Sequence, residues 1–237
     1  MKPVGIFRTA RSEGPAYFAS YLDRRSIAWQ LVPLDEGAPV PRDPRIFSGL
    51  VFMGGAMSAN DDLPWIAPVL ELMREAVRKD LPVLGHCLGG QLLAKAFGGT
   101  VRANPYKEIG WGEVRVCDNG VAREWLGDLQ AFETFQWHGE TFSIPPGATR
   151  VLENAHCANQ AFALGKYFGM QCHVEMTPEL VETWIGTGEE EMRAASSSPA
   201  VQRPEEMRRD LPQRLERLHQ VADRIYDRWT AGLSRGS

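Results

Sequence analysis

Residues 81–94 read LPVLGHCLGGQLLA, an apolar run that passes directly into a helix-forming one. At the junction, Cys87 lies between Gly85 and Gly89 in a Gly-x-Cys-x-Gly pattern, the cysteine counterpart of the Gly-x-Ser-x-Gly nucleophile elbow. A sharp strand-to-helix turn strains the backbone at its central residue, and the flanking glycines leave room for neighbouring chain. Free N–H groups and the helix dipole favour a thiolate at a helix N-terminus. The pattern therefore predicts a nucleophile, although a lone cysteine is more often a small buried residue.

The chain up to this elbow alternates short apolar or β-branched runs with runs of helical periodicity. We expect strands at residues 2–7, 28–33, 49–53 and 82–85, and helices at residues 15–24, 65–78 and 89–97. This alternation predicts an α/β fold with a doubly wound, mostly parallel sheet flanked by helices.

Beyond residue 110 the pattern changes. Short extended segments continue to about His173, separated by turn-forming sequences at residues 118–120, 145–147 and 165–166. A small antiparallel extension of the sheet is expected in this region.

The C-terminal part is expected to contain two helices joined by a loop. Thr177 and Pro178 have the residue types of a helix N-cap and first position. Residues 194–204, rich in Ser and Ala, indicate a loop or mobile connector. Apolar residues then recur at helical spacing, at Leu211, Leu215, Leu218, Ala222, Ile225 and Trp229. Such a stripe predicts a helix packed on the domain, with a contact to a second subunit in a homo-oligomer as the alternative.

Length and charge limit the possibilities further. The 237 residues fit one sizeable domain, which we place at residues 1–190, followed by the connector and terminal helix at residues 191–237. The chain has 26 Lys and Arg and 30 Asp and Glu, a net charge of −4. It has no basic block of the kind that indicates binding to nucleic acid or to a membrane surface. We expect a small-molecule substrate. No apolar run reaches the roughly 20 residues of a membrane span or forms a signal-peptide core, so a cytoplasmic location is expected.

The four cysteines do not predict a disulfide framework, because no secretory signal accompanies them. His156-Cys157 and Cys172-His173 offer four candidate zinc ligands. Sequence neighbours on extended chain point to opposite sides and converge poorly on one ion. We expect no metal and no cofactor.

A thiol nucleophile needs a base, and His173 with Glu175 supplies one. Residues two apart on extended chain face the same side, so an imidazole and a carboxylate can be presented together. The imidazole can accept the thiol proton and return it to a leaving amine, while Glu175 holds the ring in the useful tautomer. From imidazole chemistry alone, His138 beside Glu140 is a rival base. His86 adjoins the nucleophile but should point away from it on the strand.

Acyl transfer also needs hydrogen-bond donors for the developing oxyanion. The N–H of Leu88, directly after the nucleophile, is one natural donor. A second can come from residues 51–56, where an apolar strand ends in Gly54-Gly55 and backbone can approach a ligand closely. A plain tight turn explains paired glycines equally well.

Together these residues resemble the class I, or triad, glutamine amidotransferases, in particular the stand-alone group similar to the amidotransferase domain of GMP synthase. The resemblance spans most of residues 1–180. Its markers are Gly54-Gly55, GHCLGGQ at 85–91, KEIGW at 107–111, Trp137-His138 and GMQCHVE at 169–175. It implies a flavodoxin-like α/β fold and attack of the elbow cysteine on glutamine, which gives a γ-glutamyl thioester and ammonia, followed by hydrolysis to glutamate.

The resemblance also implies a role for each matching residue. Cys87 is then the nucleophile, His173 rather than His138 the base, and Glu175 the residue that orients it. Gly55, of the Gly54-Gly55 pair at the substrate site, and Leu88 offer the oxyanion N–H groups, and Gln91 with the Trp137–Gly139 backbone helps to hold the amino-acid end of the substrate. Three positions depart from the pattern: Val174 replaces proline, His86 replaces an apolar residue, and Gly90 replaces a frequent histidine.

Three functions remain open on the sequence. A glutamine amidotransferase subunit would pass ammonia to a separate synthetase, since no glycine-rich phosphate loop is found in the chain. A stand-alone γ-glutamyl hydrolase or peptidase would use the same triad with another leaving amine. A non-catalytic binding protein of the same fold is the third.

Overall fold

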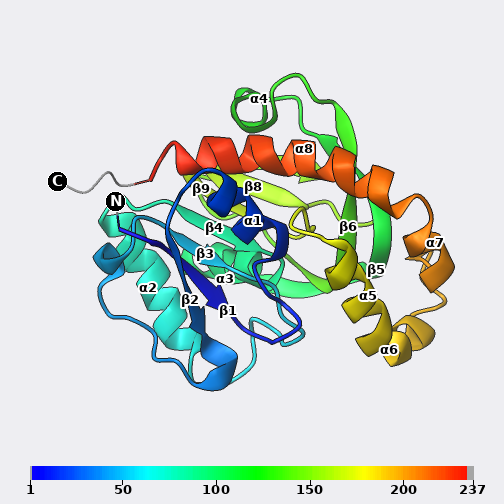
Figure 1. Cartoon of the computed structure of the whole chain (residues 1–237), viewed down its shortest axis with the longest axis horizontal. Helices are drawn as coiled ribbons and strands as arrows, with labels where there is room; N and C mark the ends of the chain where they lie inside the picture. The colour runs from blue at the N-terminus through cyan, green and yellow to red at the C-terminus, as the bar shows by residue number, and fades with distance from the viewer. Residues whose placement is uncertain (1, 234–237) are drawn as a thin grey trace.

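The first hundred residues form the parallel half of the sheet in the computed structural model, which describes residues 2–233 (Figure 1). Its strands are β1 (Val4–Arg8), β2 (Trp29–Pro33), β3 (Leu50–Phe52) and β4 (Val83–His86), and its helices are α1 (Ala16–Arg24), α2 (Ile66–Arg78) and α3 (Leu88–Ala96). Two short 3-10 turns, Leu34–Glu36 and Pro44–Ile46, join β2 to β3. Pairing is parallel, as the alternation of runs predicts, and the strand order is β2-β1-β3-β4.

The second half adds antiparallel strands to the same sheet. They are β5 (Val101–Val116), β6 (Ala131–Phe142), β7 (Thr149–Glu153), β8 (Ala161–Leu164) and β9 (Tyr167–Met170). Strand β9 pairs parallel to β4, and β8, β7, β5 and β6 follow in antiparallel pairs. The prediction of a mostly parallel sheet with an antiparallel extension is confirmed.

Two details of this half were wrong in the sequence analysis. Strand β5 begins at Val101, well before residue 110, and it pairs with β6 along most of its length. The turn expected at residues 118–120 instead starts α4 (Gly120–Leu126), whose N-cap Asn119 accepts a hydrogen bond from the Ala122 N–H. Asn, Asp and Gly favour turns and helix N-caps alike, so composition alone does not separate the two.

The expected connector at residues 194–204 is more ordered than predicted. It lies between α6 (Glu189–Ala194) and α7 (Pro204–Arg208), and its strand β10 (Ala200–Val201) adds to the edge of β5. The Gln202 side chain bonds both the N–H and the carbonyl of Trp111. These contacts are made to residues distant in sequence, so local composition does not predict them.

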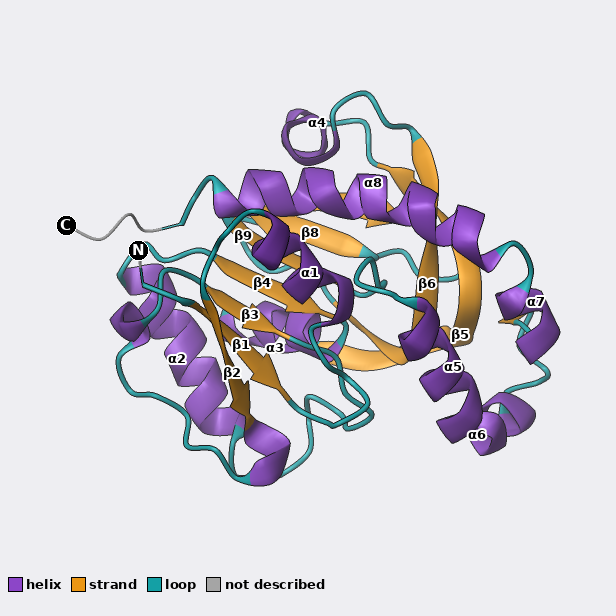
Figure 2. Ribbon diagram, in the orientation of Figure 1, coloured by secondary structure: helices purple, strands orange, loops and turns teal. Residues whose placement is uncertain are grey.

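The sheet buries a separate hydrophobic core on each face. Side chains alternate along each strand: in β1, Ile6 joins the core with α1, whereas Phe7 joins the core with α2 and α3. Helix α5 (Pro178–Thr187) has Thr177 as its N-cap, as predicted. Figure 2 shows α8 (Leu211–Thr230) crossing the sheet, and it contacts α1, α4 and β6. Within residues 2–233, no helix is long and apolar enough to cross a membrane.

Candidate functional site

The predicted elbow forms between β4 and α3. Cys87 is the N-cap of α3 with φ 48° and ψ −107°, a backbone conformation that L residues rarely adopt. A Cβ at Gly85 would overlap the backbone of Gly89, and a Cβ at Gly89 would overlap the Phe52 carbonyl of β3. The strained backbone is therefore kept by close packing that only glycine permits at both positions.

His173 and Glu175 follow β9 and lie beside the elbow. The two form a hydrogen bond of 2.6 Å between His173 Nδ1 and Glu175 Oε1, and both side chains are 1% exposed. The backbone at residue 173 is fixed as well: its N–H donates to the Phe135 carbonyl, and its carbonyl accepts a bond of 2.8 Å from Thr134 Oγ1. Because Nδ1 donates to the carboxylate, Nε2 is the nitrogen left to exchange a proton.

The charges in this cluster support one another. Burial by itself lowers the pKa of His173, but the Glu175 carboxylate and the Cys87 sulfur outweigh it and raise the pKa of His173 well above its usual value. Burial likewise opposes the charged form of Glu175, yet the positive charge on His173 lowers the pKa of Glu175 to about 2. A charged imidazole beside a charged carboxylate is therefore the favoured state.

A second histidine lies behind Glu175. His86 is fully buried, with its Nε2 3.8 Å from Glu175 Oε2 and 3.1 Å from the Tyr226 hydroxyl on α8. The sequence analysis gave His86 no role, because strand alternation directs it away from the nucleophile. Its contact with Glu175 depends on the pairing of β4 with β9, and no local pattern shows this.

A cavity of about 520 Å³ opens in front of Cys87. Its walls come from the loop after β1, the loop after β3, the start of α3, strand β6 and the helices α5 and α6. Among the predicted site residues, those that line it are Gly55, Cys87, Gln91, Trp137, Gly139 and His173. Gly54, Leu88 and Glu175 are outside the lining. The cavity has the volume usual for a small-molecule site.

The two residues that carry the predicted oxyanion donors, Gly55 and Leu88, are packed against each other. A Cβ at Gly55 would come within 2.8 Å of Leu88 Cδ2 and would overlap Thr9 Oγ1, so the backbone here is packed tightly against the start of α3. Neither the Gly55 N–H nor the Leu88 N–H has an acceptor among the described residues 2–233. Two unpaired donors beside a cysteine are what an oxyanion requires.

Gln91 is joined to a residue that the sequence analysis missed. Its Nε2 lies 3.1 Å from Gln171 Oε1 and 3.4 Å from the Glu140 carbonyl, and Gln171 Nε2 in turn lies 3.4 Å from Cys87 Sγ. Gln171 precedes His173 by two residues, so strand alternation places both on the same side. This two-residue spacing from His173 is the sequence pattern that could have identified Gln171 as a site residue.

His138, the rival base, is held by other groups. Its Nδ1 donates to the Glu140 carbonyl at 3.0 Å, and its Nε2 lies 3.0 Å from Glu108 Oε2. The two ring nitrogens of His138 are thus directed at Glu140 and Glu108 rather than at Cys87.

The pair of Glu108 and His138, with Cys157, is also close enough to hold a metal ion. Both Glu108 oxygens, however, already accept amide hydrogen bonds, from Asn154 at 2.6 Å and from Gln160 at 2.9 Å. We interpret this cluster as a buried polar network that supports β5 and β6.

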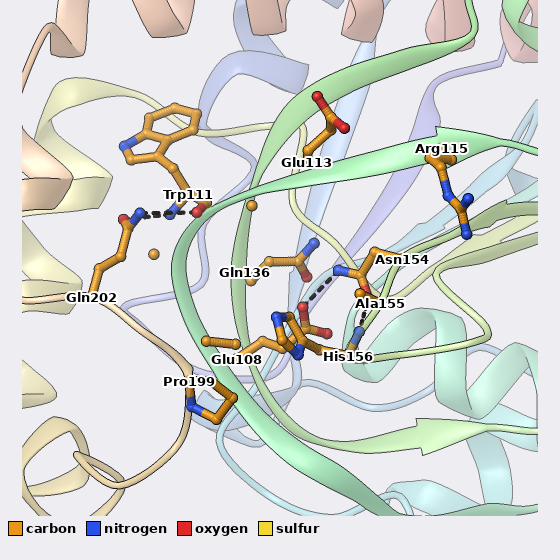
Figure 3. Close-up of a pocket in the computed structure, with 13 residues that line it drawn as sticks. Glu108, Trp111, Glu113, Arg115, Gln136, Asn154, Ala155, His156, Pro199 and Gln202 are labelled. Carbon is orange, nitrogen blue, oxygen red and sulfur yellow. Dashed lines mark hydrogen bonds between the residues drawn. The ribbon is translucent and has the colours of Figure 1, made fainter.

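A second cavity, of about 360 Å³, lies along β5 (Figure 3). Gln136, Asn154 and His156 border it, and Asn154 bonds Glu108 there. The triad side chains are not among its lining residues. The chemistry predicted from the sequence therefore belongs to the cavity in front of Cys87.

The cysteines differ in their surroundings. All four are free thiols. Burial raises the pKa of Cys172 and raises the pKa of Cys157 to about 11, and burial also raises the pKa of Cys117. Only Cys87 combines a helix N-terminus with an imidazole partner and an open cavity.

Known proteins resemble this chain in sequence and in fold. The family model of the class-I glutamine amidotransferases matches residues 17–185. A glutamine amidotransferase-like protein of Salmonella typhimurium, YfeJ, is 30% identical over 190 residues, covering 77% of this chain and 79% of its own. The crystal structure of a glutamine amidotransferase from Methylobacillus flagellatus superposes with a TM-score of 0.97 at 45% identity, covering 100% of this chain and 97% of that one.

Two further relatives have more specific names. GMP synthase of Aeropyrum pernix is 32% identical over 145 residues, which are 58% of this chain but 27% of that protein. Gamma-glutamyl peptidase 3 of Arabidopsis thaliana is 26% identical over 172 residues, 69% of each chain.

Proposed function

The chain belongs to the class I glutamine amidotransferase family, and on that premise we propose that it hydrolyses the γ-amide of glutamine or of a related γ-glutamyl compound. The reaction passes through a thioester on Cys87. One observation carries the proposal: the elbow cysteine at the N-terminus of α3 shares a cavity with an imidazole that Glu175 holds by a 2.6 Å hydrogen bond.

In the first step, the Cys87 sulfur attacks the carbon of the γ-amide and a C–S bond forms. The oxygen takes up the negative charge and accepts hydrogen bonds from the N–H groups of Gly55 and Leu88. The protonated imidazole of His173 gives its proton to the nitrogen as the C–N bond breaks. The amine leaves, and the γ-glutamyl group remains on sulfur.

In the second step, water takes the place of the amine. His173 accepts a proton from the water, which attacks the thioester carbon, and the C–S bond then breaks. Glutamate is released and the sulfur regains its original state. While His173 is protonated, its positive charge holds the pKa of the Glu175 carboxyl at about 2 against the effect of burial.

The amino-acid end of the substrate is assigned to the wall formed by Gln91, Trp137 and Gly139. A bond of 2.6 Å from Trp137 Nε1 to Glu191 fixes that ring on the wall. In this orientation the γ-amide reaches Cys87, and the leaving nitrogen faces His173.

The named relatives indicate two alternatives for the amine that is released. The GMP synthase relatives favour release of ammonia to a separate synthetase subunit. The gamma-glutamyl peptidase favours a stand-alone hydrolase with a larger leaving amine, and a cavity of about 520 Å³ has room for one.

The test is release of ammonia or amine from glutamine and a series of γ-glutamyl amides, with and without cell extract. We expect turnover without any nucleotide, trapping of a γ-glutamyl group on Cys87 by mass spectrometry, and no turnover in Cys87→Ala. Cys117→Ala is the matched control and should keep the activity. A folded protein with free Cys87 that releases nothing from any γ-glutamyl compound would rule out the enzyme and leave a binding protein.

A further inference from the structure

Glu13 brings a carboxyl group to the catalytic cavity that the proposed reaction does not use. It lies in the loop between β1 and α1 and lines the same cavity as Cys87 and His173. A Cβ at Gly54 would lie 2.5 Å from Glu13 Oε2 and 3.2 Å from His173 Cε1. The carboxyl group and the edge of the imidazole are therefore neighbours, and the missing side chain at Gly54 gives the carboxyl its space.

The loop that carries Glu13 is bonded to Trp184 of α5, a residue that also packs against His173. The Glu13 N–H donates to the Ala10 carbonyl at 3.0 Å, and Trp184 Nε1 donates to the Ser12 carbonyl at 2.8 Å. The Trp184 ring also packs edge-on against His173, with ring centroids 4.6 Å apart. The position of Glu13 beside His173 is thus set by the fold.

The carboxyl group of Glu13 is without a partner. No hydrogen bond or ion pair reaches it from any residue in the described part of the chain, 2–233. Burial raises the pKa of Glu13 to about 8; the charge of His173 lowers it and that of Glu175 raises it further. Glu13 is half-buried on the cavity wall, and a positive group supplied by a ligand would favour the charged form of its carboxyl.

The position of Glu13 in the cavity decides which part of the substrate it can contact. His173 delivers its proton to the leaving nitrogen, so the leaving amine departs along the imidazole edge that Glu13 adjoins. The amino-acid end of the substrate lies toward Gln91 and Gly139. Glu13 therefore faces the part of the substrate beyond the scissile nitrogen.

The charged side chains of the cavity wall are consistent with binding of a positively charged ligand group. Besides Glu13, the lining includes Glu140 and Glu191, and its single ammonium group, Lys107, is already paired with Glu191. Ser58 Oγ lies 3.1 Å from Glu140, so that carboxylate has a donor. Carboxyl groups thus outnumber the ammonium group in the lining, which favours entry of a positively charged group.

We propose that Glu13 is a specificity-determining residue that binds a second, positively charged amino group on the leaving amine, so that the preferred substrates are γ-glutamyl amides of diamines. The inference rests on the proposed function and names the substrate class of the same site. Hydrolysis then releases glutamate and the free diamine, with the same bonds formed and broken as for glutamine.

The experiment compares γ-glutamyl-ethylenediamine with γ-glutamyl-propylamine, which have leaving amines of equal size and differ in one cationic group. We expect the wild type to have a higher kcat/KM for the diamine compound by about 10-fold or more, the usual effect of one charge-assisted hydrogen bond. Glu13→Gln keeps the shape of the side chain and should bring the ratio close to one, mainly through a higher KM for the diamine compound. Glu13→Ala should do the same.

Glu140→Gln is the matched control, since it removes a carboxylate from another part of the cavity wall. It should leave the ratio between the two substrates as in the wild type. A ratio near one in the wild type, or a ratio unchanged in Glu13→Gln, would overturn the assignment while turnover of both amides still upheld the proposed function. No turnover of either compound or of glutamine would overturn both.

Discussion

Replacing Glu175 by Gln removes one charge from the triad while keeping the size of the side chain. Burial disfavours the Glu175 carboxylate, but His173, and to a smaller extent His86, stabilise it enough to lower its pKa from 4.5 to about 2. Each pKa unit corresponds to about 1.4 kcal/mol, so the charged state gains about 3 kcal/mol from its surroundings. The same interaction stabilises the His173 imidazolium.

Loss of about 3 kcal/mol of imidazolium stabilisation corresponds to a fall of about 10²-fold in rate. Glu175→Gln should therefore lower kcat/KM for glutamine, or for the best γ-glutamyl amide, by this factor. His173→Ala removes the proton carrier itself and should lower it by about 10²- to 10⁴-fold. The assay is initial-rate release of ammonia or amine, with the folded state of each variant checked by thermal unfolding.

Glu108→Gln is the matched control for this experiment. Glu108 is equally buried, at 2% exposure, and lies 3.0 Å from an imidazole, that of His138. Its loss should lower the free energy of unfolding and leave the rate near that of the wild type. If Glu108→Gln or His138→Ala slows the reaction more than Glu175→Gln or His173→Ala, the base has been assigned to the wrong histidine.

Three further predictions test the elbow and the triad by other measurements. A glutamine-like electrophile should label Cys87 first and Cys172 slowly, because burial raises the pKa of Cys172, and peptide mapping that finds Cys172 labelled first would contradict this. Gly89→Ala should destabilise the fold by about 1–3 kcal/mol, because its Cβ would overlap a backbone carbonyl of β3. Gly186→Ala, at an exposed position of α5 with nothing within 4 Å of the added Cβ, should instead stabilise the fold by about 0.5–1 kcal/mol. Denaturant unfolding measures both effects, and equal effects would contradict the packing argument. Because the pKa of Glu175 in the folded protein lies below its usual value, the stabilising effect of its charge is complete above pH 4.5 and is lost as the pH falls toward about 2. The difference in unfolding free energy between wild type and Glu175→Gln should therefore shrink over this range. A constant difference would contradict the ion pair.

The sequence by itself determined the features that depend on neighbouring residues. The elbow follows from Cys87 between Gly85 and Gly89, since a strained strand-to-helix turn with close backbone packing needs glycine on both sides. The parallel pairing of β1 to β4 follows from the alternation of apolar runs with helical periods. The common face of His173 and Glu175 follows from the alternation of extended chain.

Other features were decided by the tertiary structure alone. Glu13 reaches His173 because the loop after β1 packs against Gly54, and His86 reaches Glu175 because β4 pairs with β9. The segment at residues 194–204 takes its strand from pairing with β5. Each of these contacts joins residues far apart in the chain, and its energy comes from burial and pairing that exist only once the sheet has formed. Local patterns in the sequence carry no record of such partners, so the elbow and the common face of His173 and Glu175 could be predicted, whereas the place of Glu13 on the cavity wall could not.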